Sequence, residues 1–338
     1  MKRLFFLLLT GLLVWGCGDD EKEECVFKPE IDAPINIEIQ QFADSLVNIQ
    51  SKKDLIAILG RQPLMRDYIF RRAEYPDDSV FIRELYKRFT HPSIDALVGE
   101  TKKTFGDLSS LQSQFNEAFS TIKYYYPAFV PPVVQTVVSL PDTDLLVTDS
   151  LIIVSLDHFL GDSGKYRPKV YDYMLRRYDP DDIVPSCVLL YGIGDQINKS
   201  DMKDKTVLAE MIAYGKSFYF AKHMLPCTPD SVFLWYTAAD MRGARENEDL
   251  IWARLIQDKI LFSTSMIEKR NYLGERPYTI QVGEKCPGRI GQWIGWQIVN
   301  SFMKANPDVS LQQLMAMDDA QKLFKDSHYK PKDAKSVH

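Results

Sequence analysis

The spacing of apolar residues along the chain predicts a mostly helical protein. Apolar residues recur at steps of three and four over residues 36–59, 79–90 and 93–125, which is the pattern of a helix with one buried face. The same pattern returns after residue 157. There it predicts further helices over 180–195, 203–224, 237–261, 264–273, 288–305, 310–317 and 318–327.

Between these helical stretches, the pattern is typical of short strands. Residues 133–138 are mostly β-branched, and two further short apolar runs, 145–147 and 151–156, follow turn-forming residues. These runs predict a small sheet of three or four strands. We therefore expect an α+β fold, a predominantly helical single domain with a small central β-sheet.

The first sixteen residues have the layout of an export signal. Met1-Lys2-Arg3 is basic, and residues 4–14 are almost wholly apolar. That run is about half of the roughly 20 residues that a membrane-spanning helix needs. Val14-Trp15-Gly16-Cys17 then resembles a bacterial lipobox, so we expect cleavage of residues 1–16 and a lipid on the Cys17 thiol. The alternative is a soluble-secretory signal with an incidental cysteine.

The residues after Cys17 are strongly acidic. Residues 18–24 hold five carboxylates in seven positions, which favours a solvated chain over a packed one. We expect an acidic flexible tether over 17–35, one globular domain over 36–330 and a disordered tail over 331–338. The acidic run resembles the signal that sends Bacteroidota lipoproteins to the outer face of the outer membrane. It is equally explained as a plain spacer, so the membrane leaflet stays open.

The net charge limits the kinds of partner that the protein can bind, and the cysteines bear on the disulfides that it can form. Without Lys2 and Arg3 the chain has 39 basic against 46 acidic residues, a net charge of −7 that argues against nucleic acid as a partner. In an oxidising envelope the remaining cysteines allow three pairings, among which the sequence does not choose. Cys227 and Cys286 sit beside proline in expected loops, Cys187 lies in an apolar helix, and Cys25 follows the acidic run.

Common catalytic motifs are absent from the sequence. No two histidines are four residues apart, so HExxH is missing, and neither a Gly-x-Ser-x-Gly elbow nor a Walker A loop occurs. We therefore predict no cofactor, no metal and no catalytic residue of the common types.

Five residues still form a candidate functional cluster. Asp157 and His158 follow a strand, where sites are often built, but the sequence favours Asp157 as a turn cap and His158 as a surface residue. Glu210 and Lys216 lie on a strongly apolar helix, where they form either a buried pair with perturbed pKa values or charges at the rim of the core. The fifth candidate is Arg289.

Arg289 begins a glycine-containing segment. It lies near the N-terminus of a predicted helix, against the helix dipole, so an internal carboxylate or a bound anion would be needed to explain it. Gly291 and Gly295 lie on one face of that helix and each costs about 1 kcal/mol relative to alanine. We expect a neighbouring backbone to pack closely there.

With these segments, the chain resembles the gliding-motility lipoprotein GldB family of the Bacteroidota. The resemblance covers nearly the whole chain after the signal, and it implies a lipid-anchored, non-catalytic envelope protein. It further implies protein partners in the gliding and type IX secretion machinery, with the outer membrane as the expected location. The resemblance is most specific in residues 125–127, 148–161, 211–220, 246–252 and 287–299.

A second, fainter similarity is to zinc peptidases of the zincin type. Those enzymes carry HExxH on the helix after an edge strand and a glutamate ligand before a glycine on the next helix. Here the first helix reads Ile-Val-Pro-Ser-Cys-Val-Leu-Leu over 183–190, and Tyr214 precedes Gly215. The similarity therefore implies a distantly zincin-like fold without the metal site. An envelope hydrolase built from Asp157, His158 and Glu210 remains the alternative function, and a glycan or peptide binder is a third.

Overall fold

The computed structural model describes Cys25 and residues 28–140, 143–201 and 203–331. The predicted export signal, Cys17, the acidic run of 18–24 and most of the predicted tail lie outside the described residues. The predictions for these segments therefore stay predictions.

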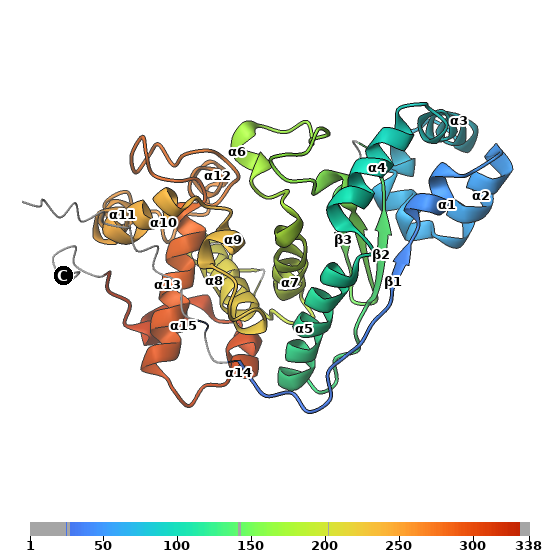
Figure 1. Cartoon of the computed structure of the whole chain (residues 1–338). Helices are drawn as coiled ribbons and strands as arrows, with labels where there is room; N and C mark the ends of the chain where they lie inside the picture. The colour runs from blue at the N-terminus through green and yellow to red at the C-terminus, as the bar shows by residue number, and fades with distance from the viewer. Residues whose placement is uncertain (1–24, 26–27, 141–142, 202, 332–338) are drawn as a thin grey trace, which may run out of the picture.

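The described chain is an α+β domain, as the pattern predicted. Its small sheet lies between two groups of helices (Figure 1). The sheet separates two hydrophobic clusters, because alternate strand residues face opposite sides. Ile152 and Val154 belong to the larger cluster, formed with the C-terminal helices, whereas Ile153 belongs to the smaller one, formed with the N-terminal helices.

The sheet has four strands in the order β1-β2-β4-β3. β1, β2 and β4 run parallel, and β3 pairs antiparallel with β4 at the edge. Three of the strands confirm the prediction for 133–156. The strands are β1 (Ile39–Gln41), β2 (Val133–Val137), β3 (Leu145–Val147) and β4 (Leu151–Ser155).

β1 and the breaks after it correct the prediction of one helix over 36–59. Ile39 pairs with Val134 on β2, and a contact between residues so far apart in the sequence cannot be inferred from the local spacing of apolar residues. A second break comes at Ser51, whose extended backbone and capping box with Asp54 start a new helix. The N-terminal elements are α1 (Ala43–Val47), α2 (Lys52–Arg61), the π-helix η1 (Met65–Ile69), the 3-10 turn η2 (Arg72–Glu74) and α3 (Asp78–Phe89).

The predicted helices 93–125 and 237–261 are each divided in two. Gly106 and Leu108, both with positive φ, separate α4 (Ile94–Phe105) from α5 (Ser109–Tyr125). Asn247 separates α10 (Ala238–Glu246) from α11 (Glu248–Gln257). The local apolar spacing continues across both breaks, which explains the error.

The helices after the sheet agree with the remaining predictions. α7, α8 and α13 form the largest packed group. α6, α9 and the 3-10 turn η3 were not predicted, whereas the 3-10 turn η4 forms the start of the predicted helix 180–195. Within the described residues, no helix is long and apolar enough to cross a membrane. These elements are η3 (Leu156–His158), α6 (Asp172–Leu175), η4 (Pro180–Asp182), α7 (Ile183–Ile193), α8 (Val207–Met224), α9 (Asp230–Leu234), α12 (Met266–Tyr272), α13 (Ile290–Ala305), α14 (Leu311–Ala316) and α15 (Ala320–Ser327).

Glycines let α8 and α13 cross in backbone contact. A Cβ built on Gly295 would lie 1.9 Å from the carbonyl oxygen of Met211, and one on Gly215 would lie 2.3 Å from the carbonyl oxygen of Gly295. A Cβ on Gly291 would lie 2.8 Å from Leu273 Cδ2. The predicted close approach of a neighbouring backbone is therefore confirmed.

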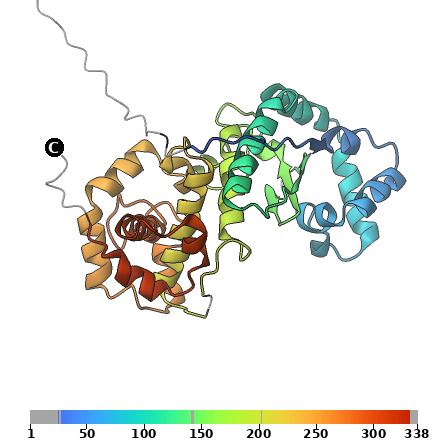
Figure 2. The same ribbon diagram turned by 90° about the horizontal axis from the view of Figure 1, so that it is seen from below.

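The segment before β1 is packed and not free. Lys28 Nζ lies 2.6 Å from Glu117 Oε1, and the Ile35 amide donates to Ser120 Oγ at 2.7 Å, both on α5. Figure 2 follows this dark blue segment from the C-terminal helices towards α1. Two residues of the predicted tether, Lys28 and Ile35, therefore contact α5.

A disulfide joins this segment to the C-terminal half. Cys25 bonds Cys227 in the loop after α8, which decides among the pairings that the sequence left open. Cys187 is a buried free thiol, and Cys286 is a half-buried one.

Candidate functional site

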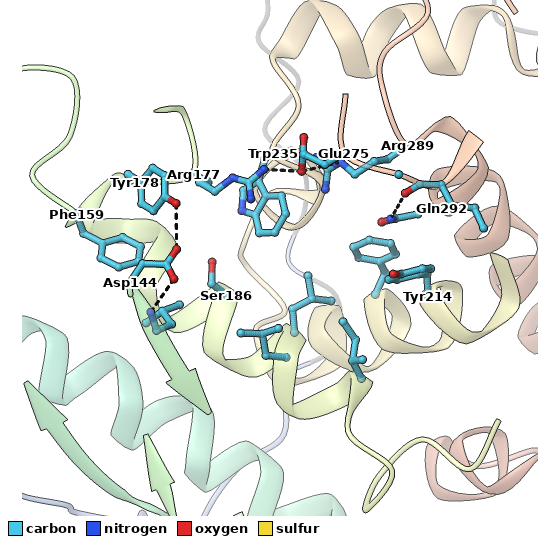
Figure 3. A pocket seen from close by; sticks show the side chains of 17 residues that line it. Asp144, Phe159, Arg177, Tyr178, Ser186, Tyr214, Trp235, Glu275, Arg289 and Gln292 are labelled. Carbon is cyan, nitrogen blue, oxygen red and sulfur yellow. Dashed lines mark hydrogen bonds and ion pairs between the residues drawn. The ribbon is translucent and has the colours of Figure 1, made fainter. Parts of the chain in front are cut away.

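A cavity of about 400 Å³ opens where the start of β3 faces α7, α8 and α13 (Figure 3). It has an apolar floor and a polar rim, the composition usual for ligand sites. The floor is formed by Leu145, Phe159, Leu189, Leu190, Ile193, Phe218 and Leu273. The rim is formed by Asp144, Arg177, Ser186, Tyr214, Trp235, Glu275, Arg289 and Gln292, with Tyr178 beside Asp144.

One face of α7 supplies much of the floor. α7 is apolar on all sides, so one face packs in the core and another is left to line the cavity. Ser186, Leu190 and Ile193 recur at steps of three and four on that second face. Leu190 is 44% exposed and Ile193 41% exposed, high values for large apolar side chains. The floor is therefore an apolar surface that the chain itself leaves uncovered.

Two arginines and one carboxylate form the far rim of the cavity. Arg177 Nη2 lies 2.5 Å from Glu275 Oε2, and Arg289 Nε lies 3.8 Å from the same oxygen. Both guanidinium groups lie over the ring of Trp235, at 4.3 and 4.7 Å from its centroid. Because two cations share one carboxylate, this end of the cavity carries a positive charge.

Arg289 is held by the local backbone as well as by these partners. It is the N-cap of α13 and has a left-handed backbone, with φ at 59°. Its guanidinium also donates to the carbonyl of Leu234. Burial lowers the pKa of Arg289, although an arginine stays charged at any physiological pH. The carboxylate partner that the sequence required is Glu275.

Several polar groups of the rim are unpaired. The Arg177 Nε atom is buried without a hydrogen-bond partner. Ser186 and Tyr214 line the cavity, and among the described residues neither hydroxyl has a hydrogen-bond partner. A buried donor without a partner is costly, so the Nε atom of Arg177 marks a position where a ligand would be favourable.

The opposite end of the cavity is closed by Asp144. Its Oδ1 accepts from the Leu145 amide at 2.8 Å, and its Oδ2 accepts from the Tyr178 hydroxyl at 3.0 Å. Burial and the nearby Asp144 raise the pKa of Tyr178, so its proton stays in this hydrogen bond. The cavity is therefore polar at both ends, with arginines at one and a satisfied carboxylate at the other.

The structure does not bring the five candidate residues together. Arg289 alone of the five lines this cavity. Asp157 accepts from the amides of Ser139 and Leu140 at 3.0 and 2.8 Å, so it caps the chain after β2. His158 Nε2 lies 2.9 Å from the Leu140 carbonyl, and the side chain is buried and not at the surface. Burial raises the pKa of Asp157 to about 6.

Glu210 and Lys216 do not form the buried pair that was one of the two alternatives left by the sequence. Glu210 Oε1 lies 2.5 Å from Lys269 Nζ, whereas Lys216 Nζ donates to the Met317 carbonyl at 2.6 Å. The two side chains point to different sides of α8, where tertiary neighbours supply the partners. Burial lowers the pKa of Lys216 to about 8.

The site residues that the sequence did not single out come from separate loops. Arg177 follows α6, Trp235 follows α9, and Glu275 follows α12. An isolated arginine or glutamate in a loop has no distinctive spacing. The paired Arg176-Arg177 was the one local signal, and its partner could not be identified without the fold.

The two helices named by the zincin similarity do border one cavity. α7 presents Ser186 and Leu190 there, and α8 presents Tyr214. These side chains are not the usual ligands of zinc. In the described part of the chain, no group of three histidine, cysteine, aspartate or glutamate side chains is placed to hold a metal ion. The distant zincin relationship itself stays a prediction.

The fold and the cavity define a helical α+β protein with a ligand-sized, arginine-rimmed cavity beside the edge of its sheet. The sequence profile of one family, described as gliding motility protein GldB, matches residues 24–331. The chain therefore belongs to the GldB family of gliding-motility lipoproteins. No curated protein and no solved structure matches the chain significantly.

Proposed function

We propose that this protein is a lipid-anchored component of the bacterial cell envelope that supports gliding and the type IX secretion machinery by binding protein partners. The observation that carries the proposal is the family match over residues 24–331, nearly the whole chain after the acidic run. The uncovered apolar floor of the cavity supports a binding role, since such surfaces mark interaction sites.

The anchor in this proposal is a lipid on Cys17. Cys25 follows Cys17 by eight positions. An extended chain spans about 3.5 Å per residue, so the disulfide would lie within roughly 28 Å of the lipid. The acidic residues of 18–24 would form the flexible part of the tether, and the outer membrane is the proposed location. This arrangement keeps the loop around Cys227 near the membrane.

The proposal assigns no catalytic step to the cavity. A serine becomes a nucleophile when an adjacent base removes its proton, and no histidine lies among the residues that line the cavity around Ser186. The Cys187 thiol faces the core, and burial raises its pKa, which leaves little reactive thiolate. The cavity chemistry therefore favours binding over hydrolysis.

Complementation of a gliding bacterium that lacks its own GldB protein tests this function. The native chain should restore colony spreading and incorporate a labelled palmitate analogue. Cys17→Ala, compared at equal protein level, should lose both the label and the spreading. Spreading restored by the unlipidated variant would contradict the anchored role.

The hydrolase alternative has its own arm in the same experiment. Ser186→Ala removes the hydroxyl that would be the candidate nucleophile of a hydrolase in this cavity. The change leaves the apolar floor as it is. We expect it to restore spreading as the native chain does. Loss of spreading by a folded, lipidated Ser186→Ala protein would favour catalysis and refute the binding role.

A further inference from the structure

The outer edge of β3 is a free strand edge beside the cavity. The Ser155 amide donates to the Asp144 carbonyl and the Thr148 amide to the Leu151 carbonyl, each across the β3–β4 pair. Since hydrogen-bonding direction alternates along an antiparallel strand, Leu145 and Val147 direct their N–H and C=O groups outward. Among the described residues no strand pairs with that side of β3.

This free edge is incompletely satisfied. The Leu145 amide is held by the Asp144 carboxylate, but the outward amide of Val147 has no protein partner among the described residues. Unpaired edge groups of this kind are a template for a further strand. Leu145 lines the cavity as well, so a chain added to this edge would pass over the cavity floor.

The floor beneath that path suits an apolar side chain. Leu190 and Ile193 are exposed there, and the cavity of about 400 Å³ has room for a large side chain. Side chains of an added strand alternate between its two faces, so one in two would point towards α7. A strand on β3 would thus cover an apolar surface that no described residue covers.

The far rim suits a negative charge. Arg177 and Arg289 share the carboxylate of Glu275 there, and an adjoining small pocket adds Arg176 and Arg276 with Asp240. This excess of positive charge stands out in a chain whose formal net charge is −5. Arg177 keeps an unpaired Nε, and guanidinium groups bind carboxylates through two parallel hydrogen bonds.

From these three features we infer that the cavity binds an extended peptide segment of a partner protein. The peptide adds to β3 as a fifth strand, places an apolar side chain over Leu190 and Ile193, and directs a carboxylate to Arg177 and Arg289. The carboxylate comes from an acidic side chain or from the C-terminus of the partner. This inference rests on the protein-binding role proposed above, and it specifies the kind of segment that is bound.

A library of random nine-residue peptides, screened against the intact disulfide-bonded chain, tests this inference. Each peptide is displayed both with a free C-terminus and as an internal segment. We expect selected peptides to carry an apolar residue and a carboxylate at a fixed spacing. The form that is enriched identifies whether the carboxylate is a side chain or a C-terminus. Failure to select any such peptide would overturn the inference.

Two variants separate strand addition from simple filling of the cavity. Val147→Pro removes the outward amide, and proline is tolerated at an edge strand when its nitrogen faces outward. This variant should bind the selected peptides at least tenfold more weakly than the native chain does. Arg177→Gln should weaken the binding of acidic peptides about tenfold and leave the binding of their amide analogues unchanged. Ile56→Asp, at a position that is 54% exposed on α2, is the matched control and should have no effect.

Dodecanoate serves as the competing probe, because a free fatty acid would use the floor and the arginines but not β3. Dodecanoate binding that survives Val147→Pro, with no peptide selected, would assign the cavity to a free carboxylic acid and overturn the peptide inference. The proposed function is judged separately, by colony spreading with Cys17→Ala. The two can therefore fail independently.

Discussion

The crossing of α8 and α13 leaves no space for a side chain at Gly295. A Cβ there would lie 1.9 Å from the Met211 carbonyl oxygen and 2.5 Å from its carbon. These are backbone atoms, which cannot turn aside as a flexible side chain can, so the helices would have to separate by more than an ångström. Forcing extra atoms into a packed core costs roughly 1–3 kcal/mol, and a backbone clash belongs at the upper end.

A gain in helix propensity partly offsets this cost. Alanine is better than glycine inside a helix by about 1 kcal/mol. We therefore expect Gly295→Ala to lower the free energy of unfolding by about 2 kcal/mol. Gly99→Ala is the matched control, because Gly99 lies within α4 and, apart from its chain neighbours and the backbone of its own helix, no described atom lies within 4 Å of the Cβ position. It should raise the free energy of unfolding by about 0.5–1 kcal/mol.

Urea denaturation followed by circular dichroism measures both effects on a soluble form that begins at residue 18. The two variants make the same glycine-to-alanine change, so the difference between their free energies of unfolding measures the cost of the clash at the helix crossing. We expect the two midpoints to move in opposite directions from that of the native chain. A Gly295→Ala protein as stable as the Gly99→Ala protein would refute the close helix crossing.

Three further predictions concern buried groups and the disulfide. Burial lowers the pKa of Lys216 to about 8, so the unfolded chain binds more protons above that pH. The free energy of unfolding should therefore rise from pH 8 to 9.5, and a Lys216→Met protein should lack that rise in urea midpoints. Burial raises the pKa of Asp182 to about 7, so this carboxyl destabilises the fold increasingly from pH 4 to 7. Asp182→Asn should thus gain thermal stability at pH 7.5 but not at pH 4, and an equal gain at both would contradict the assignment. Loss of the Cys25–Cys227 bond should cost about 2–5 kcal/mol. Cys25→Ser, Cys227→Ser and the double variant should then show equal losses in urea denaturation, and additive losses would show separate roles.

Most helices were predictable because the signals that define them are local. α8 ends at Met224 as predicted, and its start at Val207 follows Thr206, which caps the Ala209 amide. Apolar spacing and such caps depend on residues a few positions apart. The same reasoning failed where a break needed an unusual backbone, as at Gly106 and Leu108 before α5.

β1 shows where local pattern is insufficient. It has three residues, and Ile39 pairs with Val134, far along the chain. A short strand takes its stability from its partner and not from its own sequence. The predicted helix over 36–59 therefore wrongly includes Ile39-Gln40-Gln41, a segment with a single apolar residue.

The candidate site was even harder to predict from the sequence than β1. Arg289 was identified because a cation near a helix N-terminus opposes the helix dipole and so requires a partner. Glu275, Trp235 and Arg177 meet it from separate loops, and no spacing in the sequence links them. For Lys216 the sequence offered Glu210 as the nearest carboxylate, but the folded chain supplies the Met317 carbonyl instead.

The sequence by itself determined the helical class, the small sheet and membership of the GldB family, because each depends on local spacing or on a matching order of residues. The export and lipid signal at Cys17 is a further prediction from the same local order. The tertiary structure decided the disulfide partner of Cys25, the free edge of β3 and the arginine-rimmed cavity. These features depend on groups distant in sequence that become neighbours when the apolar faces of the helices and the sheet are buried together.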